Sequence, residues 1–242
     1  MAEPRADEPR RVTTEAELHQ AVRDKTVTTI RVEGEIELTR PVKVGTSRVV
    51  AIEGAGVGTL RIHSHGGPYA VKVYRSGSHL TLSGIRLTGT GVRVSDRGRL
   101  TATDTTIDGP LGCGVLVEGS GSRALISAGQ VRQSTEYGIS CKAGGHVTVK
   151  GVEVSDNKRA GVWCEGQESR VDVERGKVQG SEEYGIVCEA GGHVTVKGVE
   201  VSDNKQGGVL CGGQESRVDV EGGKVQDPWV ERSSWRIVFK DA

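Results

Sequence analysis

Two glutamates at equivalent places in related segments are the residues that most resemble a catalytic pair. Glu165 ends the segment VWCE, and Glu189 ends IVCE 24 residues later. If the intervening chain makes one turn of a repeat, the two carboxyl groups lie about 5 Å apart, the separation found in retaining glycosidases. Both glutamates, however, sit in glycine-rich and solvated segments, where no desolvation raises the pKa of one above the other. The sequence therefore offers Glu165 and Glu189 only as weak catalytic candidates.

A column of basic side chains is the second candidate for chemistry. This His/Arg column consists of His79, Arg99, Arg123, His146, Arg170, His193 and Arg217. Aligned positive or titratable groups of this kind suit a polyanion such as a nucleic-acid backbone or an acidic glycan. Beside it, lysines and glutamates alternate from Lys150 and Glu174 to Lys197 and Glu221, which would neutralise the face. We therefore interpret the column as a hydrated flank, with anion binding as the alternative.

Cysteines recur at the same spacing. Four of the five are Cys141, Cys164, Cys188 and Cys211. On strands stacked about 4.8 Å apart their Cβ atoms are slightly too far apart for a relaxed disulfide, and a straight column cannot surround one metal ion tetrahedrally. We predict that these four are small buried hydrophobic residues, and we expect no metal site and no cofactor. Cys113 falls in a different column, and we expect it near the surface.

These residues recur because the chain is built from a repeat. The segment that begins at Tyr137 returns at Tyr184, and 36 of the 47 positions are identical. Each copy divides again, since AGVWC at Ala160 repeats YGISC after 23 residues. Within each unit, valine, isoleucine, leucine and cysteine recur at a spacing of two, which indicates short strands with one buried face.

Such units predict an all-β solenoid of about nine coils, with three short strands in each coil of 23 to 24 residues. Strands this short cannot pair into hairpins and still keep the apolar columns in register, so we expect each to pair in parallel with the next coil. The interior of a coil is narrow, which explains why aromatic residues make only 3% of the chain.

One column of side chains points outward between the two buried positions of the first strand in each coil. This outward column consists of Lys72, Arg93, Leu116, Ser140, Trp163, Val187 and Leu210. It changes from basic to apolar along the chain, contains no acid, and has Tyr137 and Tyr184 beside it. An exposed apolar strip of this kind is typical of a protein or ligand contact. The alternative is that a loop or the C-terminal segment covers it.

The ends of a solenoid expose unpaired strand edges and need caps. We predict a disordered tail at 1–10, a capping helix at 11–27, a β-helix at 28–226 with near-identical repeats at 137–183 and 184–230, and a C-terminal cap at 227–242. Thr14 and Glu17 have the spacing of a capping box, which marks the start of the helix. Trp229, Trp235 and Phe239 are expected to close the other end, with a partner-binding tip as the alternative.

Charge and composition restrict the function further. Lys and Arg total 32, as do Asp and Glu, so the chain lacks the overall positive field of a non-specific nucleic-acid binder. No apolar stretch follows the charged N-terminal residues, so we expect no signal peptide and no membrane segment, and a cytoplasmic or other intracellular location. The odd number of cysteines agrees with a reducing compartment.

Several segments resemble a known superfamily. The opening VTTEAELHQAV, TIRVEGEIEL and VVAIEGAG, and the later GI-x-C and SDN-x-x-x-GV motifs, are similar to those of the right-handed parallel β-helix proteins of the pectate-lyase-like superfamily. The resemblance, together with the general preference for right-handed crossovers, implies a right-handed solenoid. It leaves the function open, because this fold serves polysaccharide lyases, hydrolases, epimerases, phage tailspikes and recognition modules without activity.

In pectate lyases and polygalacturonases the comparable groove carries clustered Asp, Lys or Arg, whereas the outward column here has no acid. We therefore expect a non-catalytic β-helix scaffold or interaction module that binds a protein partner or assembles with itself. The expected binding residues are Lys72, Arg93, Leu116, Tyr137, Trp163, Tyr184, Val187 and Leu210. The alternative is a carbohydrate-active protein, a lyase, hydrolase or glycan binder, that uses this groove for a polysaccharide.

Overall fold

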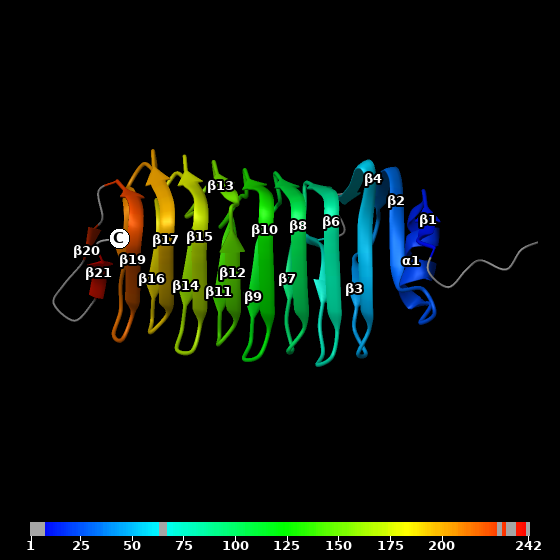
Figure 1. Cartoon of the computed structure of the whole chain (residues 1–242), viewed down its shortest axis with the longest axis horizontal. Coiled ribbons are helices and arrows are strands. Elements are labelled where there is room, and N and C mark those ends of the chain that lie inside the picture. Colours follow the sequence, from blue (N-terminus) through cyan, green and yellow to red (C-terminus); the bar gives the residue numbers. More distant parts are fainter. Residues whose placement is uncertain (1–7, 63–66, 227–228, 231–235, 241–242) are drawn as a thin grey trace, which may run out of the picture.

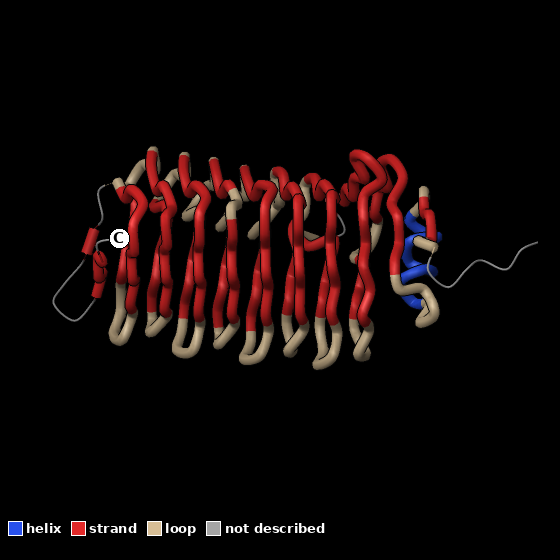
Figure 2. Tube along the Cα trace, viewed as in Figure 1, coloured by secondary structure: helices blue, strands red, loops and turns tan. Residues whose placement is uncertain are grey.

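The molecule is a rod of stacked coils (Figure 1). The computed structural model describes residues 8–62, 67–226, 229–230 and 236–240. Successive coils follow one another along the long axis, from the N-terminal helix at one end to the last strands at the other (Figure 1). Apart from that helix, the described chain is strands joined by turns (Figure 2). The parallel β-solenoid of about nine coils predicted from the repeat is confirmed.

Two sheets run along the rod. Sheet A contains β1 (Arg10–Val12), β2 (Thr29–Leu38), β4 (Val49–Ile62), β6 (His79–Thr88), β8 (Arg99–Asp108), β10 (Arg123–Arg132), β12 (His146–Lys150), β13 (Glu153–Ser155), β15 (Arg170–Gln179), β17 (His193–Ser202), β19 (Arg217–Val225) and β21 (Arg236–Lys240). Sheet B contains β3 (Val42–Val44), β5 (Tyr69–Val73), β7 (Gly91–Val94), β9 (Val115–Glu118), β11 (Ile139–Lys142), β14 (Val162–Glu165), β16 (Tyr184–Glu189), β18 (Gly207–Cys211) and β20 (Trp229–Val230). Each strand pairs in parallel with the corresponding strand of the next coil.

Like residues stack on like residues in this register. Val171 pairs with Val194, which pairs with Val218, and Cys141, Cys164 and Cys188 align in the same way in sheet B. The sequence columns are therefore physical columns along the rod.

The coils contain fewer separate strands than the sequence indicates. In most of them the expected second and third strands run together as one bent strand of about ten residues, such as β15 or β17. The bend falls at a left-handed residue, Arg175 with φ 49° in β15 and Gly198 with φ 58° in β17. A single left-handed residue bends the strand, as a β-bulge does, while the hydrogen bonds to the strands of the neighbouring coils continue on both sides of the bend. Among the described coils, the two parts are separate strands only at β12 and β13.

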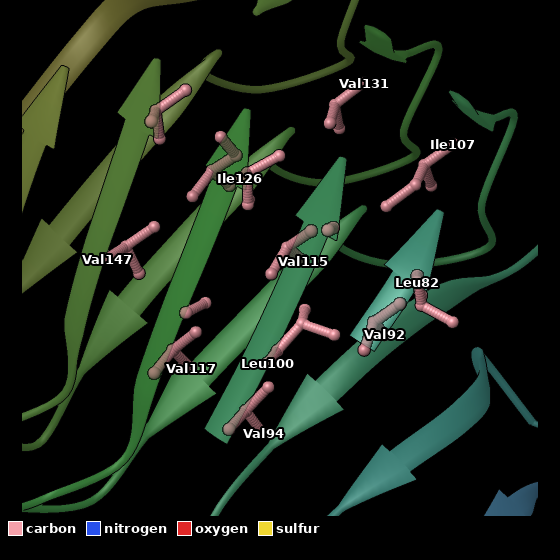
Figure 3. Close-up of a cluster of buried hydrophobic side chains, with 14 of the residues drawn as sticks. Leu82, Val92, Val94, Leu100, Ile107, Val115, Val117, Ile126, Val131 and Val147 are labelled. Carbon is pink, nitrogen blue, oxygen red and sulfur yellow. The ribbon is translucent and has the colours of Figure 1, made fainter. Parts of the chain in front are cut away.

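The core lies between the sheets and consists of aliphatic side chains. In Figure 3, Leu82, Val92, Leu100 and Val115 point from their strands into this shared interior. All four are almost completely buried. The cysteines of sheet B continue the same rows, since Cys141, Cys164, Cys188 and Cys211 are fully buried, as predicted, and form no disulfide.

The N-terminal end of the rod is covered by α1 (Glu15–Arg23). Thr14 accepts a hydrogen bond from the backbone N–H of Glu17, whose carboxylate accepts one from the Thr14 N–H, so the capping box is formed. Leu18 and Val22 bury the apolar side of the helix. We predict that Arg10–Val12 belongs partly to the tail and partly to the helix, but it forms β1 in register with β2 and buries Val12.

The C-terminal end differs from the expected aromatic cap. The side chain of Phe239 is in register with buried Val220 but remains 56% exposed, so it does not close the core. β21 pairs in parallel with β19 and continues the sheet by one strand. The inward side chains of β21 therefore lie at the end of the rod. Trp235 and the side chain of Trp229 lie outside the described residues.

Two buried asparagines support the turns between coils. Asn157 Oδ1 accepts a hydrogen bond from the Ser134 N–H, and Asn204 Oδ1 accepts one from the Ser181 N–H. These bonds join one coil to the previous one and satisfy backbone donors that would otherwise be buried without a partner.

In the described part of the chain, no helix has both the length and the apolar character needed to cross a bilayer.

Candidate functional site

The outward face of sheet B brings the predicted binding residues into one line. Lys72 pairs in register with Arg93, Arg93 with Leu116, Trp163 with Val187, and Val187 with Leu210. The outward column therefore exists as a continuous feature of the rod. Its two ends differ in chemistry and in exposure.

The basic end of the outward column is partly neutralised. The Arg93 guanidinium forms an ion pair with the Glu118 carboxylate through both Nε and Nη2. Lys72 has no carboxylate within ion-pair distance among the described residues. Burial, with Arg93 and Lys43 on the neighbouring strands, lowers the pKa of Lys72. This end of the face is therefore positively charged.

The apolar end is not the open strip that the sequence indicates. Leu116 is 8% exposed and Val187 is 5% exposed. Side chains from the starts of the strands and the turns before them, among them Tyr69 and Tyr137, pack over the column and form a second apolar cluster outside the core. The expectation of an exposed strip is therefore wrong for Leu116 and Val187. The period of the repeat does not show in which direction the covering side chains point.

Part of this cluster remains accessible. Trp163, Tyr184 and Leu210 are half-buried, and Tyr137 lies among them. We call these four residues the aromatic patch. They come from β14, β16, β18 and the turn before β11, on consecutive coils.

A stack of three planar groups fixes the patch. The rings of Tyr137 and Trp163 are parallel, with centroids 4.7 Å apart. The Arg159 guanidinium lies over the Tyr137 ring at 4.7 Å from its centroid. Trp163 Nε1 donates a hydrogen bond to Glu189 Oε2 at 3.3 Å. Burial is the main cause that raises the pKa of Tyr137 to about 12, so its phenol is neutral at physiological pH.

The candidate catalytic glutamates are neighbours in register. Glu165 on β14 pairs with Glu189 on β16, and Lys142 pairs with Glu165 on the other side. Glu189 is engaged by the Trp163 indole, which gives it a role in positioning the patch.

Sequence analysis missed Arg159, although a signal exists. In the second copy of the repeat, Gln206 stands at the position of Arg159, and Leu210 stands at that of Trp163. The two copies therefore differ at two of the three residues that form the stack.

Cys113 lies inside the apolar cluster, which corrects the expectation that it is near the surface. Its side chain is 4% exposed, and Sγ donates to Glu136 Oε2 at 3.4 Å. Burial is the main cause that raises its pKa to about 11. The side chain of Tyr69, at the start of β5, packs in the same cluster.

The His/Arg column on sheet A divides into two halves. In the C-terminal half, Asp172 accepts hydrogen bonds from His146 and Arg170. Asp219 accepts them from His193 and Arg217. The interpretation as a neutralised flank therefore fits this half.

In the N-terminal half the same column has no counter-charge. His79, Arg99 and Arg123 have no carboxylate within ion-pair distance among the described residues, and they line two grooves of about 460 and 550 Å³. His79 Nε2 lies 2.9 Å from Thr101 Oγ1 instead.

The paired half predicts a pH-dependent stability. Burial raises the pKa of Asp172 and Asp219, but hydrogen bonds from the arginine and histidine partners outweigh it and lower the pKa of both. Their contribution is therefore present above the unfolded-state pKa near 4 and is lost as the pH falls through the folded-state pKa. We expect Asp172→Asn to lower the free energy of unfolding by about 1–2 kcal/mol at pH 7, and by progressively less below pH 4.

Urea unfolding followed by circular dichroism between pH 3 and pH 7 measures this effect. Glu174→Gln is the control, because Glu174 lies on the same strand and its ion pair with Lys150 is exposed; we expect a change below about 0.5 kcal/mol. A loss in Asp172→Asn that stays constant down to pH 3 would contradict the assignment.

Comparison with known proteins identifies one family. A family model described as "Right handed beta helix region" matches residues 69–225. Neither the curated proteins nor the solved structures contain a match. Among the described residues, no group of three or more His, Cys, Asp or Glu side chains is placed to hold a metal ion.

Proposed function

Because the chain belongs to the right-handed β-helix family, whose fold serves binding as well as catalysis, we propose that it is a non-catalytic interaction module. It binds a protein partner through the outward face of sheet B, with the aromatic patch as the main contact.

The stack of Arg159, Tyr137 and Trp163 carries this proposal. Tryptophan, tyrosine and arginine are the residues that contribute most to binding energy at protein interfaces. Here the indole is held on one side by the Tyr137 ring and at its N–H by Glu189. A side chain that is already fixed loses little conformational entropy when a partner binds.

The charge of the face indicates the kind of partner. Lys72 and Lys43 form its positive end, and the aromatic patch forms its apolar end. A complementary surface has acids opposite the lysines and apolar side chains opposite the patch. In a second copy, Glu118 and Glu189 of this face are already engaged by Arg93 and Trp163, so we take the partner to be a different protein.

Photo-cross-linking tests the proposal. Benzoylphenylalanine replaces Tyr184 in one form of the chain and Leu125 in a control form, in cells that naturally express it. Leu125 is 38% exposed on sheet A, away from the patch. We expect a discrete adduct with a protein at position 184 only.

A variant taken from the chain's own second copy shows whether the stack matters. Arg159→Gln with Trp163→Leu gives the first copy the residues that the second copy has at 206 and 210, so the fold tolerates them there. We expect the yield of the adduct at position 184 to fall at least about tenfold. No adduct at 184, equal adducts at both positions, or a yield that this variant leaves unchanged would contradict the proposal.

A glycan binder or glycan-active enzyme is the second candidate. The half-exposed Trp163 indole next to Glu165 and Glu189 favours it, since flat aromatic rings can pack against sugar rings. A glycan array and a turnover assay on acidic polysaccharides distinguish the two functions. Turnover that Glu165→Gln or Glu189→Gln abolishes would establish the enzyme and overturn the non-catalytic function.

A further inference from the structure

A cleft at the N-terminal end of the rod has the features of a second binding site. It lies between α1, the segment after β2, β3 and the turn that leads into β4, and its volume is about 790 Å³. This is within the usual range for small-molecule sites. We call it the basic cleft, and its basic lining consists of His19, Arg23, Lys25, Arg40, Lys43 and Arg48. Figures 1 and 2 show α1 at this end.

Among the described residues, every charged side chain that lines the cleft is a cation. Three acids belong to α1 and its C-cap, and each is held by local partners. Glu15 accepts hydrogen bonds from the backbone N–H groups of Thr39 and Arg40 and lies 3.4 Å from Nε2 of His19. Glu17 accepts from Thr13 and Thr14, and Asp24 accepts from Thr26. The lysines and arginines of the lining therefore give the cleft a net positive charge.

Local structural roles explain why some of these positions carry a cationic side chain, but not all of them. Arg48 donates to the carbonyl oxygens of Val22 and Asp24, so it caps the C-terminal end of α1. Arg23 in the last helical turn is favoured by the helix dipole. Neither reason applies to Arg40 or Lys43, which come from other elements and have no carboxylate within ion-pair distance among the described residues.

The positive charge continues along sheet B. Lys43 pairs in register with Lys72, and like charges directly opposite each other on neighbouring strands are destabilising. The buried imidazole of His19 has its pKa lowered, first by burial and then by Arg40. An anion in the cleft would relieve this repulsion.

We propose that the basic cleft binds a small molecule that carries a diphosphate group. The planar guanidinium groups of Arg23 and Arg40 can each donate two hydrogen bonds to phosphate oxygens. Lys25 and Lys43 add ammonium groups from other elements around the cleft. Together these donors suit the many oxygens of a diphosphate. The cleft also contains the hydroxyls of Thr28, Thr46 and Ser47 and the ring of Tyr74, which can contact the organic part of the ligand.

The proposal stands apart from the function proposed for sheet B. The basic cleft contains no residue of the aromatic patch, although it shares Lys43 with the positive end of the outward face of sheet B. Loss of diphosphate binding therefore leaves cross-linking at position 184 intact, and failure of cross-linking leaves diphosphate binding intact.

Calorimetric titration of the full chain tests the cleft with four compounds: sodium pyrophosphate, ADP, adenosine and citrate. We expect pyrophosphate and ADP to bind, adenosine not to bind, and citrate to bind at least about tenfold more weakly than pyrophosphate. ADP tighter than pyrophosphate identifies a nucleotide as the source of the diphosphate. Equal affinities identify the free diphosphate group as the whole recognised unit.

Two double variants locate the site. Lys25→Gln with Arg40→Gln removes two exposed cations of the cleft that do not belong to sheet B, and we expect at least about tenfold weaker pyrophosphate binding with an unchanged melting temperature. Arg99→Gln with Arg123→Gln removes two uncompensated cations from sheet A, and we expect no change. The proposal is overturned if pyrophosphate fails to bind at 1 mM, if citrate binds as tightly, or if both double variants weaken binding equally.

Discussion

Replacing Gly185 with alanine is expected to lower the free energy of unfolding by about 3 kcal/mol. A Cβ atom at this position would lie 2.5 Å from Val201 Cγ1 and 2.8 Å from the carbonyl oxygen of Gly208 on the next coil. The second contact is with backbone, so the two coils must move apart to admit one methyl group. Interiors packed this closely resist such a displacement.

Urea unfolding of Gly185→Ala beside Gly212→Ala measures the effect. A Cβ atom at Gly212 would meet only the Glu189 side chain, at 3.7 Å, so we expect a change below about 0.5 kcal/mol there. Similar losses in the two variants would show that the coils are not stacked as closely as described.

All five thiols are expected to resist modification in the folded protein, although none forms a disulfide. A hydrogen bond with Cys164, aided by burial, raises the pKa of Cys188 to about 12, and burial raises that of Cys113 to about 11. At pH 8 the thiolate fraction of such groups is at least about 100-fold below that of an ordinary cysteine, whose pKa is near 8.5. Exclusion of the reagent from the core slows the reaction further.

Reaction with Ellman's reagent at pH 8 measures this protection. We expect no rapid phase from the native protein and five equivalents of released thiolate in 6 M guanidinium chloride. Cys113 is the informative residue, because the sequence alone places it near the surface. One equivalent released at the rate of an exposed thiol, and lost in Cys113→Ser, would show that the apolar cluster over sheet B is open.

The strand register and the buried columns could be predicted from the sequence, because both follow from the repeat. Valine or cysteine at a spacing of two, repeated after 23 or 24 residues, allows only one register in which apolar residues remain buried. The pairing of Cys164 with Cys188 could therefore be assigned from spacing alone. The Thr14 and Glu17 capping box was visible for a related reason, since it is a local pattern of four residues.

The features that the sequence could not predict depend on side chains outside the regular apolar columns of the repeat. Tyr69 begins strand β5 and Tyr137 lies in the turn before β11, and their packing with Leu116 follows from the path of the chain between the sheets, which the period does not contain. The basic cleft was missed because Arg23 and Lys43 meet only when α1 lies against β3. The exposure of Phe239 likewise follows from the end of the stack and not from residue type.

Every surface described above is a side of one rod, so the stacking of the coils is the central claim. Val49 and Arg217 belong to the same column and are separated by seven successive pairings. At a rise of ~4.8 Å for each coil, their backbones lie about 34 Å apart. Spin labels on Val49→Cys and Arg217→Cys attach selectively, because the native thiols are buried.

Pulsed electron paramagnetic resonance then measures the distance between the two labels. We expect a single distribution centred near 34 Å that becomes about 5 Å shorter when the second label moves from Arg217 to His193, one coil nearer. A distance that does not shorten by one coil step, or a broad distribution without a defined maximum, would contradict the stacked rod and with it every surface assigned to its sides.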